Sequence, residues 1–542
     1  MAPLFSIVTP VYNPPIDVLK DTIESVFAQD FTDWEWILVD DCSTDPGVLQ
    51  TLQEAARVDP RVKVISRQTN GHIVAASNDG VDAAAGTFIA LLDHDDLLTP
   101  DALQRNADLI DKHDDLDYIY SDEDKVDANG RFFDSFEKPP WSPERLRGQN
   151  YCCHFSVLRT DLVRSVGGFR EGYDGSQDYD LILRVTEQAR RIEHIAEVLY
   201  HWRVVPGSVA GGADAKPYAA VAGLKALQDH VDRVGIKAQA IAGRTPGCYQ
   251  LKRELPPDRS VSIVIPTIGS TGMVWGRERV LVIDAVRSLL ARTNHTNLEI
   301  VVVYDEPTPK RVLEELRQIA GRQLVLVPFK GKFNFSKKVN LGVLASRGER
   351  LIFLNDDIEV RTNNWVEELL APLEEPDVGM TGAMLLFSSN TIQHVGHAYL
   401  RGHYDHPGIA TPYAAPGPRG AHHINREVSG VTAACAGMRR EDFFEVGGFS
   451  EVFPANFNDV DLCYKVRSLN YRIVTLAVVE LFHFETMTRP KGVKQWEIKT
   501  VRDRWGYPTR DPYTPVFPRM RPTRAEVLTE KTKARRRALG LT

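Results

Sequence analysis

The sequence predicts an α/β protein in which two copies of one domain follow each other along the chain. Three observations support this. Short β-rich runs alternate with amphipathic helical patterns, the 542-residue length exceeds that of one ordinary domain, and the same landmarks occur twice in the same order. Sheets of this kind are largely parallel, and their ligands bind beyond the carboxyl ends of the strands. The residues that follow the strands are therefore the first candidates for function.

The two copies are recognised by landmarks with nearly constant spacing. "FSIVTPVYN" at residues 5–13 is answered by "VSIVIPTIG" at 261–269, and "VGGFREGYDGSQDYDLILRV" by "VGGFSEVFPANFNDVDLCYKV". Asn78 and Asn340 each precede a glycine by 8 residues. A period of about 260 to 280 residues is too long for a solenoid and indicates tandem domains. We expect domains at 1–245 and 258–520, joined within the Pro-, Gly- and charge-rich "AGRTPGCYQLKRELPPDRS" and followed by a basic tail at 521–542.

The elements of the first copy follow in order. After the opening strand, residues 15–29 predict a helix that Asp17 is able to cap, since apolar residues recur at helical spacing at Leu19, Ile23, Val26 and Phe27. "WEWILVDDCS" is a strand that ends in acids, and "VKVIS" is a short strand. A helix over residues 75–85 and a strand in "TFIALLDHDD" complete the pattern. Two acidic clusters thus stand at strand ends.

Composition places the chain among soluble globular proteins and narrows its partners. Hydrophobic residues make up 43% and charged residues 25%, and the formal net charge of −8 argues against a nucleic-acid-binding surface. The six cysteines, of which Cys152 and Cys153 are adjacent, include no CxxC pair and predict neither a disulfide framework nor a zinc site. Because no basic leader precedes the first strand and no run reaches about 18 apolar residues, we expect a cytoplasmic protein, attached at most to the membrane surface.

The acids of "ALLDHDDLLTP", residues 90–100, are the strongest candidate site. If Asp93 and Asp95 continue the preceding strand, positions i and i+2 point the same way and their carboxylates converge. Two such charges about 4 Å apart repel by about 4 kcal/mol at an effective dielectric constant near 20. A hard divalent cation, Mg2+ or Mn2+, relieves that repulsion and leaves positions for substrate phosphates. A solvated acidic loop is the alternative, whereas Leu97 and Leu98 disfavour a calcium-binding loop.

Three further residues are candidates, each with an ordinary structural alternative. Asp41 ends a strand and is either an acceptor for a nucleotide base or a turn-forming residue. Asp178 lies just before an amphipathic helix, where the helix dipole stabilises any acid, and Asp180 is the other acid of that stretch. His201 in "LYHWR" is by default a partly buried histidine, but its recurrence as His483 in "LFHFE" favours a function.

Taken together, the motifs resemble a known family. "FSIVTPVYNPP", "WEWILVDDCSTD", "NGHIVAASNDG", "ALLDHDDLLTPDAL", "YSDEDKVDANGR", "SQDYDLILRV" and "LYHWRVVPGSVA" look like the first half of tandem family 2 glycosyltransferases. "FNFSKKVNLGV", "LIFLNDDIEV", "TIQHVGH", "FNDVDLCYKV" and "ELFHFETMTR" resemble the second half of the same proteins. Those enzymes are bacterial and build O-antigens, capsules or other surface polysaccharides. The resemblance covers nearly the whole chain, and the number and order of its motifs make it specific.

The resemblance implies two tandem GT-A domains, a Rossmann-like fold of nucleotide-diphospho-sugar transferases, and inversion at the anomeric carbon. It implies a nucleotide-diphospho-sugar donor, a lipid-linked or growing polysaccharide acceptor, and Mn2+ or Mg2+ as cofactor. The chemistry is consistent with one base per site, because a cation can stabilise the diphosphate leaving group and only the acceptor hydroxyl then needs deprotonation. The residues it assigns in the first half are Asp178 as the base, Asp93, Asp95 and His201 for the metal, and Pro10, Tyr12 and Asp41 for the donor.

The second half matches the family with two departures. Its counterparts are Asp459 as the base, Asn355, Asp357 and His483 for the metal, and Asp305 for the donor. The acid before Asp305 has become Tyr304, and Asn355 replaces the first metal-binding acid, although its amide oxygen can still bind a cation. We therefore expect two active sites.

Rival interpretations stay open at this point. The second domain alone could lack catalysis and hold the acceptor, or the whole chain could be a non-catalytic glycan-binding scaffold. A sugar-phosphate nucleotidyltransferase is disfavoured, because "TPVYNPP" is not a glycine-rich phosphate loop. The basic tail, with Arg535–Arg537, is either a contact for anionic lipid or a solvated end. No residue decides the sugar, the linkage or the acceptor.

Overall fold

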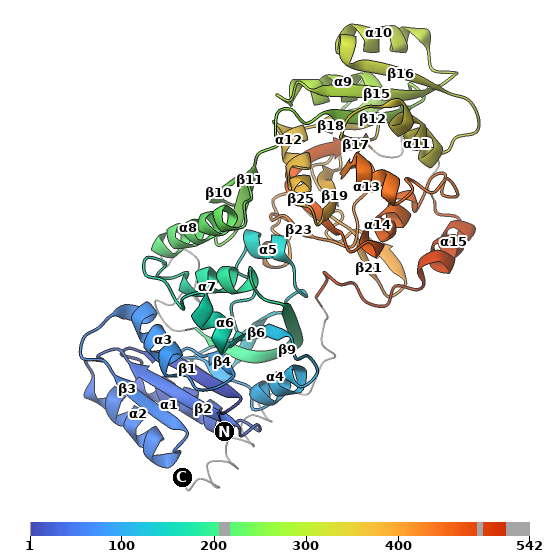
Figure 1. Cartoon of the computed structure of the whole chain (residues 1–542). Coiled ribbons are helices and arrows are strands. Elements are labelled where there is room, and N and C mark those ends of the chain that lie inside the picture. Colours follow the sequence, from blue (N-terminus) through green and yellow to red (C-terminus); the bar gives the residue numbers. More distant parts are fainter. Residues whose placement is uncertain (1, 205–216, 485–491, 516–542) are drawn as a thin grey trace. The chain divides into compact units, whose positions relative to one another are not determined.

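The chain forms two compact units. The computed structural model describes residues 2–204, 217–484 and 492–515. The first unit comprises Met1–Trp141 and Gln149–Gly235, and the second comprises Ser142–Gly148 and Ile236–Thr514 (Figure 1). The division thus falls before the expected boundary, and a short segment of the first half belongs to the second unit. The basic tail expected at 521–542 lies outside the described residues.

The first unit alternates strands and helices, as the hydrophobic pattern predicts. Its strands are β1 Phe5–Val11, β2 Trp34–Asp40, β3 Val62–Ser66, β4 Phe88–Leu91, β5 Leu97–Leu98, β6 Leu116–Val126, β7 Phe132–Phe136, β8 Val157–Arg159 and β9 Arg191–Arg203. Its helices are α1 Ile16–Phe27, α2 Pro46–Val58, α3 His72–Ala83, α4 Ala102–Ile110, α6 Thr160–Ser165, α7 Gln177–Thr186 and α8 Pro217–Arg233. Asp17 lies in the first turn of α1 instead of capping it, since the N-cap is Pro15.

The second unit repeats this pattern and adds elements. Its strands are β10 Ala238–Ala242, β11 Tyr249–Arg253, β12 Val261–Thr267, β13 Thr271–Val274, β14 Arg277–Val280, β15 Leu298–Asp305, β16 Leu324–Phe329, β17 Arg350–Leu354, β18 Ile358–Val360, β19 Val378–Leu386, β20 Ile392–His394, β21 Ala398–Leu400, β22 His403–Asp405, β23 Arg426–Glu427, β24 Cys435–Arg439 and β25 Arg472–His483. Its helices are α5 Pro143–Gly148, α9 Leu281–Ala291, α10 Lys310–Ala320, α11 Phe335–Ala345, α12 Trp365–Leu370, α13 Arg440–Glu445, α14 Asn458–Ser468 and α15 Gln495–Trp505, with short 3-10 turns at Gly321–Gln323, Ala371–Glu374 and Pro418–Gly420.

The two large sheets have the same topology. The strand order is β3-β2-β1-β4-β8-β6-β9-β5 in the first unit and β16-β15-β12-β17-β24-β19-β25-β18 in the second. From β3 to β4, and from β16 to β17, the pairing is parallel, and beyond these strands it is mixed. The repeated landmarks in the sequence therefore reflect two domains of one architecture.

Helices on both faces bury the apolar strands of the first sheet. Leu19 of α1 and Leu52 of α2 pack with Ile7 and Trp36 in one buried cluster on one face. On the other face α3 lies so close to β1 that a Cβ on Gly80 would be 2.4 Å from a methyl carbon of Val8. Because both faces are covered, the strands read as continuous hydrophobic runs, and their carboxyl ends are left for the site.

The landmark glycines are explained by a contact made in both units. The Gly86 N–H donates to Ser6 Oγ (2.8 Å), and the Gly348 N–H donates to Ser262 Oγ (2.7 Å). A Cβ on either glycine would lie within 2.6 Å of the backbone nitrogen of its serine. Glycine is therefore required where the chain enters β4 and β17 against β1 and β12.

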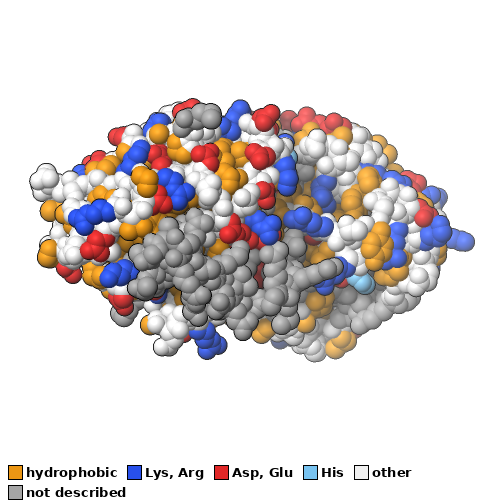
Figure 2. Space-filling model, turned by 90° about the horizontal axis from the view of Figure 1, so that it is seen from below, with side chains coloured by type: hydrophobic (Ala, Val, Ile, Leu, Met, Phe, Trp, Pro, Cys, Tyr) orange, Lys and Arg blue, Asp and Glu red, His pale blue; other side chains and the backbone are white. Residues whose placement is uncertain are grey.

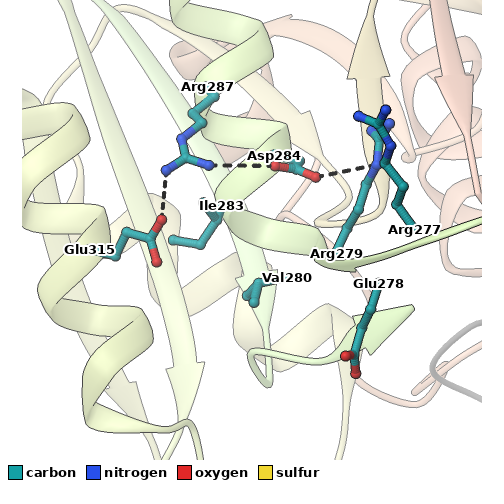
Figure 3. Close-up of a pocket in the computed structure, with 8 residues that line it drawn as sticks. All are labelled: Arg277, Glu278, Arg279, Val280, Ile283, Asp284, Arg287 and Glu315. Carbon is teal, nitrogen blue, oxygen red and sulfur yellow. Dashed lines mark hydrogen bonds and ion pairs between the residues drawn. The ribbon is translucent and has the colours of Figure 1, made fainter. Parts of the chain in front are cut away.

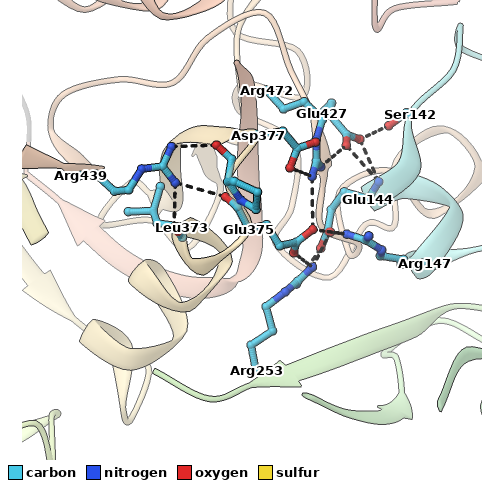
Figure 4. A network of polar contacts seen from close by, with 11 residues as sticks. Ser142, Glu144, Arg147, Arg253, Leu373, Glu375, Asp377, Glu427, Arg439 and Arg472 are labelled. Carbon is cyan, nitrogen blue, oxygen red and sulfur yellow. Dashed lines mark hydrogen bonds and ion pairs between the residues drawn. The ribbon is translucent and has the colours of Figure 1, made fainter. Parts of the chain in front are cut away.

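The stretch expected to join the domains is instead ordered within the second unit. β11 pairs with β10 and carries Arg253, which is 4% exposed in its side chain. Arg253 contacts Glu144 of α5 (2.6 Å) and Glu375 (2.9 Å), and Arg147 of α5 contacts Glu375 (2.7 Å). The Glu144 N–H also donates to Glu427 Oε1 (3.0 Å) (Figure 4). These buried pairs bind residues 142–148 into the second unit.

The surface carries charges of both signs. Figure 2 shows Lys, Arg, Asp and Glu side chains interspersed on the visible face, outside the grey residues. That mixture accords with a net charge of only −8 over 542 residues. Among the helices within the described ranges, none combines the length and the apolar character that a membrane crossing requires.

Candidate active sites

The acids of the first unit lie in a turn. β4 ends at Leu91, and the Asp96 N–H donates to the Asp93 carbonyl (3.3 Å) before β5 begins at Leu97. The expectation that Asp93 and Asp95 continue the strand is therefore wrong, and the i, i+2 alternation of a strand does not apply to them. The structural reason is the tight connection between β4 and β5, since β5 turns back to pair antiparallel with β9.

Asp93 is brought together with Asp96 and His154. One ligand-capable atom from each of the three lies within 4.8 Å of the others. Burial raises the pKa of Asp93, and although His154 opposes this, the nearby carboxylates of Asp95 and Asp178 raise it further. Asp95 and Asp178 thus belong to the same electrostatic neighbourhood. A cluster of this charge favours a bound cation.

Asp96 and His154 also make contacts with neighbouring side chains and backbone of the first unit. Asp96 accepts hydrogen bonds from the Tyr200 hydroxyl (2.5 Å) and the Arg203 N–H (2.7 Å). The His154 ring stacks on Tyr200 at 4.6 Å between centroids, and its Nδ1 lies 3.2 Å from Glu123 Oε2. Burial lowers the pKa of His154, but Cys153 and Glu123 outweigh it and leave the pKa well above its usual range. Sequence reasoning missed His154, because the second copy has Ala434 at the matching distance from its VGGF motif.

The structure separates the two acids that the sequence left open before α7. Asp180 is fully buried, and it is held by Arg170 and by Arg184 (2.7 Å). Asp178, in the first turn of α7, is partly exposed and accepts a hydrogen bond from Asn150 Nδ2 (2.8 Å). The Cys153 thiol approaches the same oxygen at 3.5 Å. Asp180 is therefore structural, and Asp178 is the acid that faces the Asp93 cluster.

His201 lies on β9 and is 2% exposed in its side chain. Its Nδ1 is 2.5 Å from Asp124 Oδ1, and its ring packs 4.1 Å from that of Phe132. The convergent group around Asp93 does not include His201 or Asp95. A carboxylate on Nδ1 is a common partner of metal-binding histidines, and the assignment of His201 to the metal stays a prediction.

The donor candidates surround the carboxyl ends of β1 and β2. Asp41 is buried and accepts hydrogen bonds from Arg67 Nη1 (2.9 Å) and the Gly71 N–H (2.9 Å), both at the same oxygen. His94 Nδ1 lies 3.0 Å from the Pro10 carbonyl, which links this end to the acidic turn. Tyr12 is 45% exposed just beyond β1.

Asn13, which sequence reasoning missed, ties these loops together. Its Oδ1 accepts from the Thr44 N–H (2.8 Å) and the Asp45 N–H (3.3 Å), and its own N–H donates to Ser43 Oγ (3.1 Å). Asn13 has φ 47°, a left-handed conformation that asparagine tolerates better than most residues. The Asn after the TPVY run was the signal available in the sequence.

In the second unit, the three metal candidates converge. His483 Nε2 lies 3.1 Å from Asp357 Oδ1 and 3.1 Å from Asn355 Nδ2. Asp357 is 7% exposed in its side chain. Asp356 between them accepts a hydrogen bond from Thr267 Oγ1 (2.6 Å), and burial with the neighbouring Asp357 raises its pKa to about 7. An amide flip of Asn355 presents its oxygen, so this donor set fits a hard divalent cation.

The other candidates of the second unit resemble those of the first. Asp305 ends β15 and pairs with the buried Lys338 (2.9 Å). Asp459 lies in the first turn of α14, and two residues later the fully buried Asp461 pairs with Lys465 (3.5 Å) and Arg504 (2.9 Å). The arrangement of a partly exposed acid followed by a buried, paired acid thus occurs in both units.

A hollow of about 390 Å³ in the second unit lies away from these residues. Figure 3 shows its lining, which comes from β14, α9 and α10 and comprises Arg277, Glu278, Arg279, Val280, Ile283, Asp284, Arg287 and Glu315. Arg287 pairs there with Glu315 (2.6 Å) and Asp284 (3.8 Å). None of the candidate site residues lines it, and we assign it no chemistry.

Comparisons with known proteins give a consistent picture. The family described as "Glycosyl transferase family 2" matches residues 6–167 and 262–447. The chain is 42% identical over 495 residues to the uncharacterized protein y4gI of Sinorhizobium fredii, covering 90% of this chain and 54% of that protein. It is 34% identical over 517 residues to the O-antigen biosynthesis protein RfbC of Myxococcus xanthus, covering 94% of this chain and 40% of that protein. The chain therefore spans about half or less of the length of these relatives.

Solved structures show a more distant likeness. TarS 1-349 of S. aureus in complex with UDP-GlcNAc matches with a TM-score of 0.34 and 23% identity, covering 43% of this chain and 72% of that chain. GalNAc-T7 with UDP, GalNAc and Mn2+ matches with a TM-score of 0.36 and 17% identity, covering 45% of this chain and 48% of that chain.

Proposed function

Because the chain belongs to glycosyltransferase family 2, with two α/β domains of the GT-A type, we propose that it transfers sugars from nucleotide-diphospho-sugar donors to a cell-surface glycan at two inverting, metal-dependent active sites. The acceptor we propose is a lipid-linked or growing polysaccharide at the cytoplasmic face of the membrane. The name of the relative RfbC, an O-antigen biosynthesis protein, supports this acceptor class.

One observation carries the proposal of two sites. Each unit places a partly exposed acid, Asp178 or Asp459, in the first turn of a helix, and the next acid along, Asp180 or Asp461, is fully buried and paired with a basic side chain. A helix dipole alone accounts for an acid in a first turn, but it does not explain why one acid is partly exposed while the other is buried and paired. We assign Asp178 and Asp459 as the catalytic bases.

The base needs only one carboxylate in a single displacement. Asn150 holds Oδ2 of Asp178, so we assign Oδ1 to take the proton of the acceptor hydroxyl as that oxygen attacks the anomeric carbon. Attack from the face opposite the diphosphate inverts the configuration. Burial first, and then the charges of Asp95 and Asp178, raise the pKa of the adjacent Asp93, and a cation bound there would relieve the repulsion among these carboxylates.

The metal ligands we propose are Asp93, Asp95 and His201 in the first unit and Asn355, Asp357 and His483 in the second. Bound Mn2+ or Mg2+ supplies a Lewis acid that stabilises the charge developing on the diphosphate. The convergence of the second set within 3.1 Å contacts supports that set. In the first unit Asp93 converges with Asp96 and His154, so the assignment of Asp95 and His201 rests on the family resemblance.

The donor's nucleotide is assigned to the carboxyl ends of the first two strands of each unit. Asp41 keeps one oxygen engaged with Arg67 and Gly71, which orients the other toward a base N–H. Pro10 and Tyr12 form the wall beside it, and Asp305 takes the place of Asp41 in the second unit. Lys338 positions Asp305 as Arg67 positions Asp41.

A rival assignment makes only the first unit catalytic and gives the acceptor to the second. The replacement of an acid by Asn355, and the presence of Tyr304 beside Asp305, favour it. The convergence of Asn355, Asp357 and His483 favours two active sites, because a site without catalytic function does not require its metal ligands to converge.

The test is donor consumption across a panel of UDP, dTDP and GDP sugars, with an oligosaccharide acceptor, in Mn2+, Mg2+ or EDTA. We expect consumption that requires metal, and a product whose anomeric configuration, read by NMR, is inverted. Consumption unaffected by EDTA overturns the metal dependence. Glycan binding without nucleotide or metal, with no donor consumed, supports the scaffold instead.

A further inference from the structure

Gln393 contacts His483 at two points. His483 Nδ1 lies 2.7 Å from Gln393 Oε1, and Gln393 Nε2 donates to the His483 backbone carbonyl (3.4 Å). The second contact fixes which end of the amide is which, because a carbonyl only accepts. The oxygen of Gln393 therefore faces Nδ1, and Nδ1 of the ring carries the proton.

This tautomer turns a lone pair toward the candidate metal ligands. In the neutral ring, the proton on Nδ1 leaves a lone pair on Nε2, and Nε2 lies 3.1 Å from the carboxylate oxygen Oδ1 of Asp357. Two acceptors at this distance repel unless a proton or a metal cation lies between them, and the Asn355 amide, whose Nδ2 lies 3.1 Å from Nε2, can rotate to offer its oxygen to the same cation. In an octahedral ion with bonds of about 2.1 Å, adjacent ligands are about 3.0 Å apart, which is the spacing seen here. The 3.1 Å distance thus suits two neighbouring ligands of one ion, although a hydrogen bond from a protonated ring has the same length.

The strand that carries Gln393 is itself fixed. β20 pairs with β19, and residue 394 lies on the opposite face of the strand from residue 393. His394 Nε2 accepts from the Gly396 N–H and the Thr432 N–H (3.2 Å each), so its proton is on Nδ1, which lies 2.9 Å from His406 Nδ1.

The histidines around β20 form a support for the strand. His394, His397 and His406 cluster within metal-binding distance. However, the proton on His394 Nδ1 points at His406 and occupies the direction that a metal would need. Burial, with repulsion from His397 and His406, lowers the pKa of His394 well below its usual range, and burial likewise lowers the pKa of His397. These contacts hold β20, and through it Gln393, in place.

The first unit orients its histidine with a carboxylate. His201 Nδ1 lies 2.5 Å from Asp124 Oδ1, and Asp124 comes from β6, which pairs with β9. β20 follows β19, the counterpart of β6, and supplies an amide. A carboxylate on Nδ1 makes a histidine a more basic ligand than an amide does.

We propose that Gln393 is the positioning residue of the second metal site: it fixes the ring and tautomer of His483 so that Nε2 binds a divalent cation with Asp357 and Asn355. This inference rests on the proposed metal dependence of the second unit. With an amide behind its histidine, the second site should bind the metal more weakly than the first site, whose histidine is oriented by the carboxylate of Asp124.

The test is Mn2+ binding to the full-length chain, measured by electron paramagnetic resonance without donor or acceptor. An Asp93→Asn/Asp95→Asn background silences the first site, so that only the second is titrated. Gln393→Leu, which removes the acceptor, should weaken Mn2+ binding about 10- to 100-fold. Gln393→Glu, which replaces the amide by a carboxylate, should tighten it several-fold. Gln318→Leu, on the exposed face of α10, is the matched control.

Opposite effects at one position distinguish positioning from packing. If both Gln393 variants weaken binding equally, or if neither changes it, Gln393 does not orient the ligand and the inference is overturned while the metal site stands. If the background binds no Mn2+ at all, the proposed second metal site fails together with the inference.

Discussion

Asn340 and Phe449 share two hydrogen bonds: the Asn340 side chain donates to the Phe449 carbonyl (2.9 Å) and accepts from the Phe449 N–H (3.0 Å). Asn78 makes the same two bonds with Phe169, at 2.9 and 2.8 Å. In each unit the bonds join the helix after the third strand to the VGGF motif that leads to the proposed base. The repeated Asn and the repeated VGGF motif thus form the same pair of hydrogen bonds in both units.

Removal of this pair of hydrogen bonds should destabilise each unit. Asn78→Ala leaves a backbone N–H and a carbonyl of Phe169 without their partner, at a cost of about 1 to 3 kcal/mol. Urea unfolding of the full chain should show a lower midpoint for one transition, and Asn340→Ala should lower the other. Asn129→Ala, in an exposed turn, is the control. Unchanged midpoints in both variants would contradict the structural role given to this pair.

The two acids in the first turn of α7, Asp178 and Asp180, should respond differently to substitution. Asp180→Asn leaves the buried Arg184 without its carboxylate and should lower the free energy of unfolding by about 3 to 5 kcal/mol. Asp178→Asn should leave stability within about 1 kcal/mol, because Asn150 can still bond to it. Differential scanning calorimetry of both variants checks this. Equal destabilisation by the two would remove the argument that Asp178 is kept for chemistry.

The second unit should lose stability in acid through Glu375. Although burial raises it, Arg147, Arg253 and Arg472 lower the pKa of Glu375 to about 2. A carboxylate with a depressed folded-state pKa stabilises the fold fully above its ordinary value of 4.5, and that stability is lost as pH falls from 4.5 toward 2.

Glu375→Gln lacks this titrating charge, so its unfolding free energy should fall less steeply than wild type between pH 4.5 and 2. Urea unfolding across that range measures it, with Glu314→Gln on the exposed face of α10 as control. At pH 7 the variant should already be less stable, by about 3 kcal/mol or more, since it leaves buried guanidinium groups short of a partner. A parallel pH profile would contradict the assignment.

Residues 142–148 should be required for the second unit to fold. A fragment of residues 236–514 alone lacks Glu144 and leaves the buried Arg253 with Glu375 as its remaining ion-pair partner. We expect no cooperative urea transition from it, and recovery of one when residues 138–150 are fused ahead of it by a flexible linker. Glu144→Ala in that fusion is the control. A fragment that folds equally well without the segment would refute its structural role.

The sequence predicts the repeated architecture well, because several of the repeated residues occupy positions that few other residue types can fill. Gly86 and Gly348 fit where no Cβ can, and Asn78 and Asn340 each satisfy two backbone groups, so both pairs recur at fixed spacing. Such positions are visible without a structure. The alternation of strands and helices predicts the parallel part of each sheet, but not the mixed pairing beyond β4 and β17.

The sequence predicts the sites less completely, because their supporting residues come from segments distant along the chain. Asn150 and His154 lie in an irregular segment before β8, and no periodicity marks them. Gln393 stands on β20, which pairs with β19 as β7 pairs with β6. In the first unit, however, the contact to the histidine comes from Asp124 of β6, so the internal repeat points away from Gln393. The acids after β4 were assigned to a strand because hydrophobic residues flank them, whereas antiparallel pairing of β5 with β9 forces a turn.

The boundary between the domains was also beyond sequence reasoning. "AGRTPGCYQLKRELPPDRS" has the composition of a linker, yet Arg253 within it is buried by ion pairs with Glu144 and Glu375. Composition reports the average preference of a segment, and buried pairs of distant residues override it.

The central claim, two catalytic sites in one chain, is tested most directly by product analysis of Asp178→Asn, Asp459→Asn and the double variant. Full-length proteins receive Mn2+, an acceptor oligosaccharide and the donor panel, with Asp174→Asn in the exposed loop before α7 as control. Each single variant should lower one transfer step by about 100-fold or more and leave the other intact, because each removes one general base. Loss confined to Asp178→Asn would make the second unit an acceptor-binding domain, and full transfer by the double variant would contradict the account.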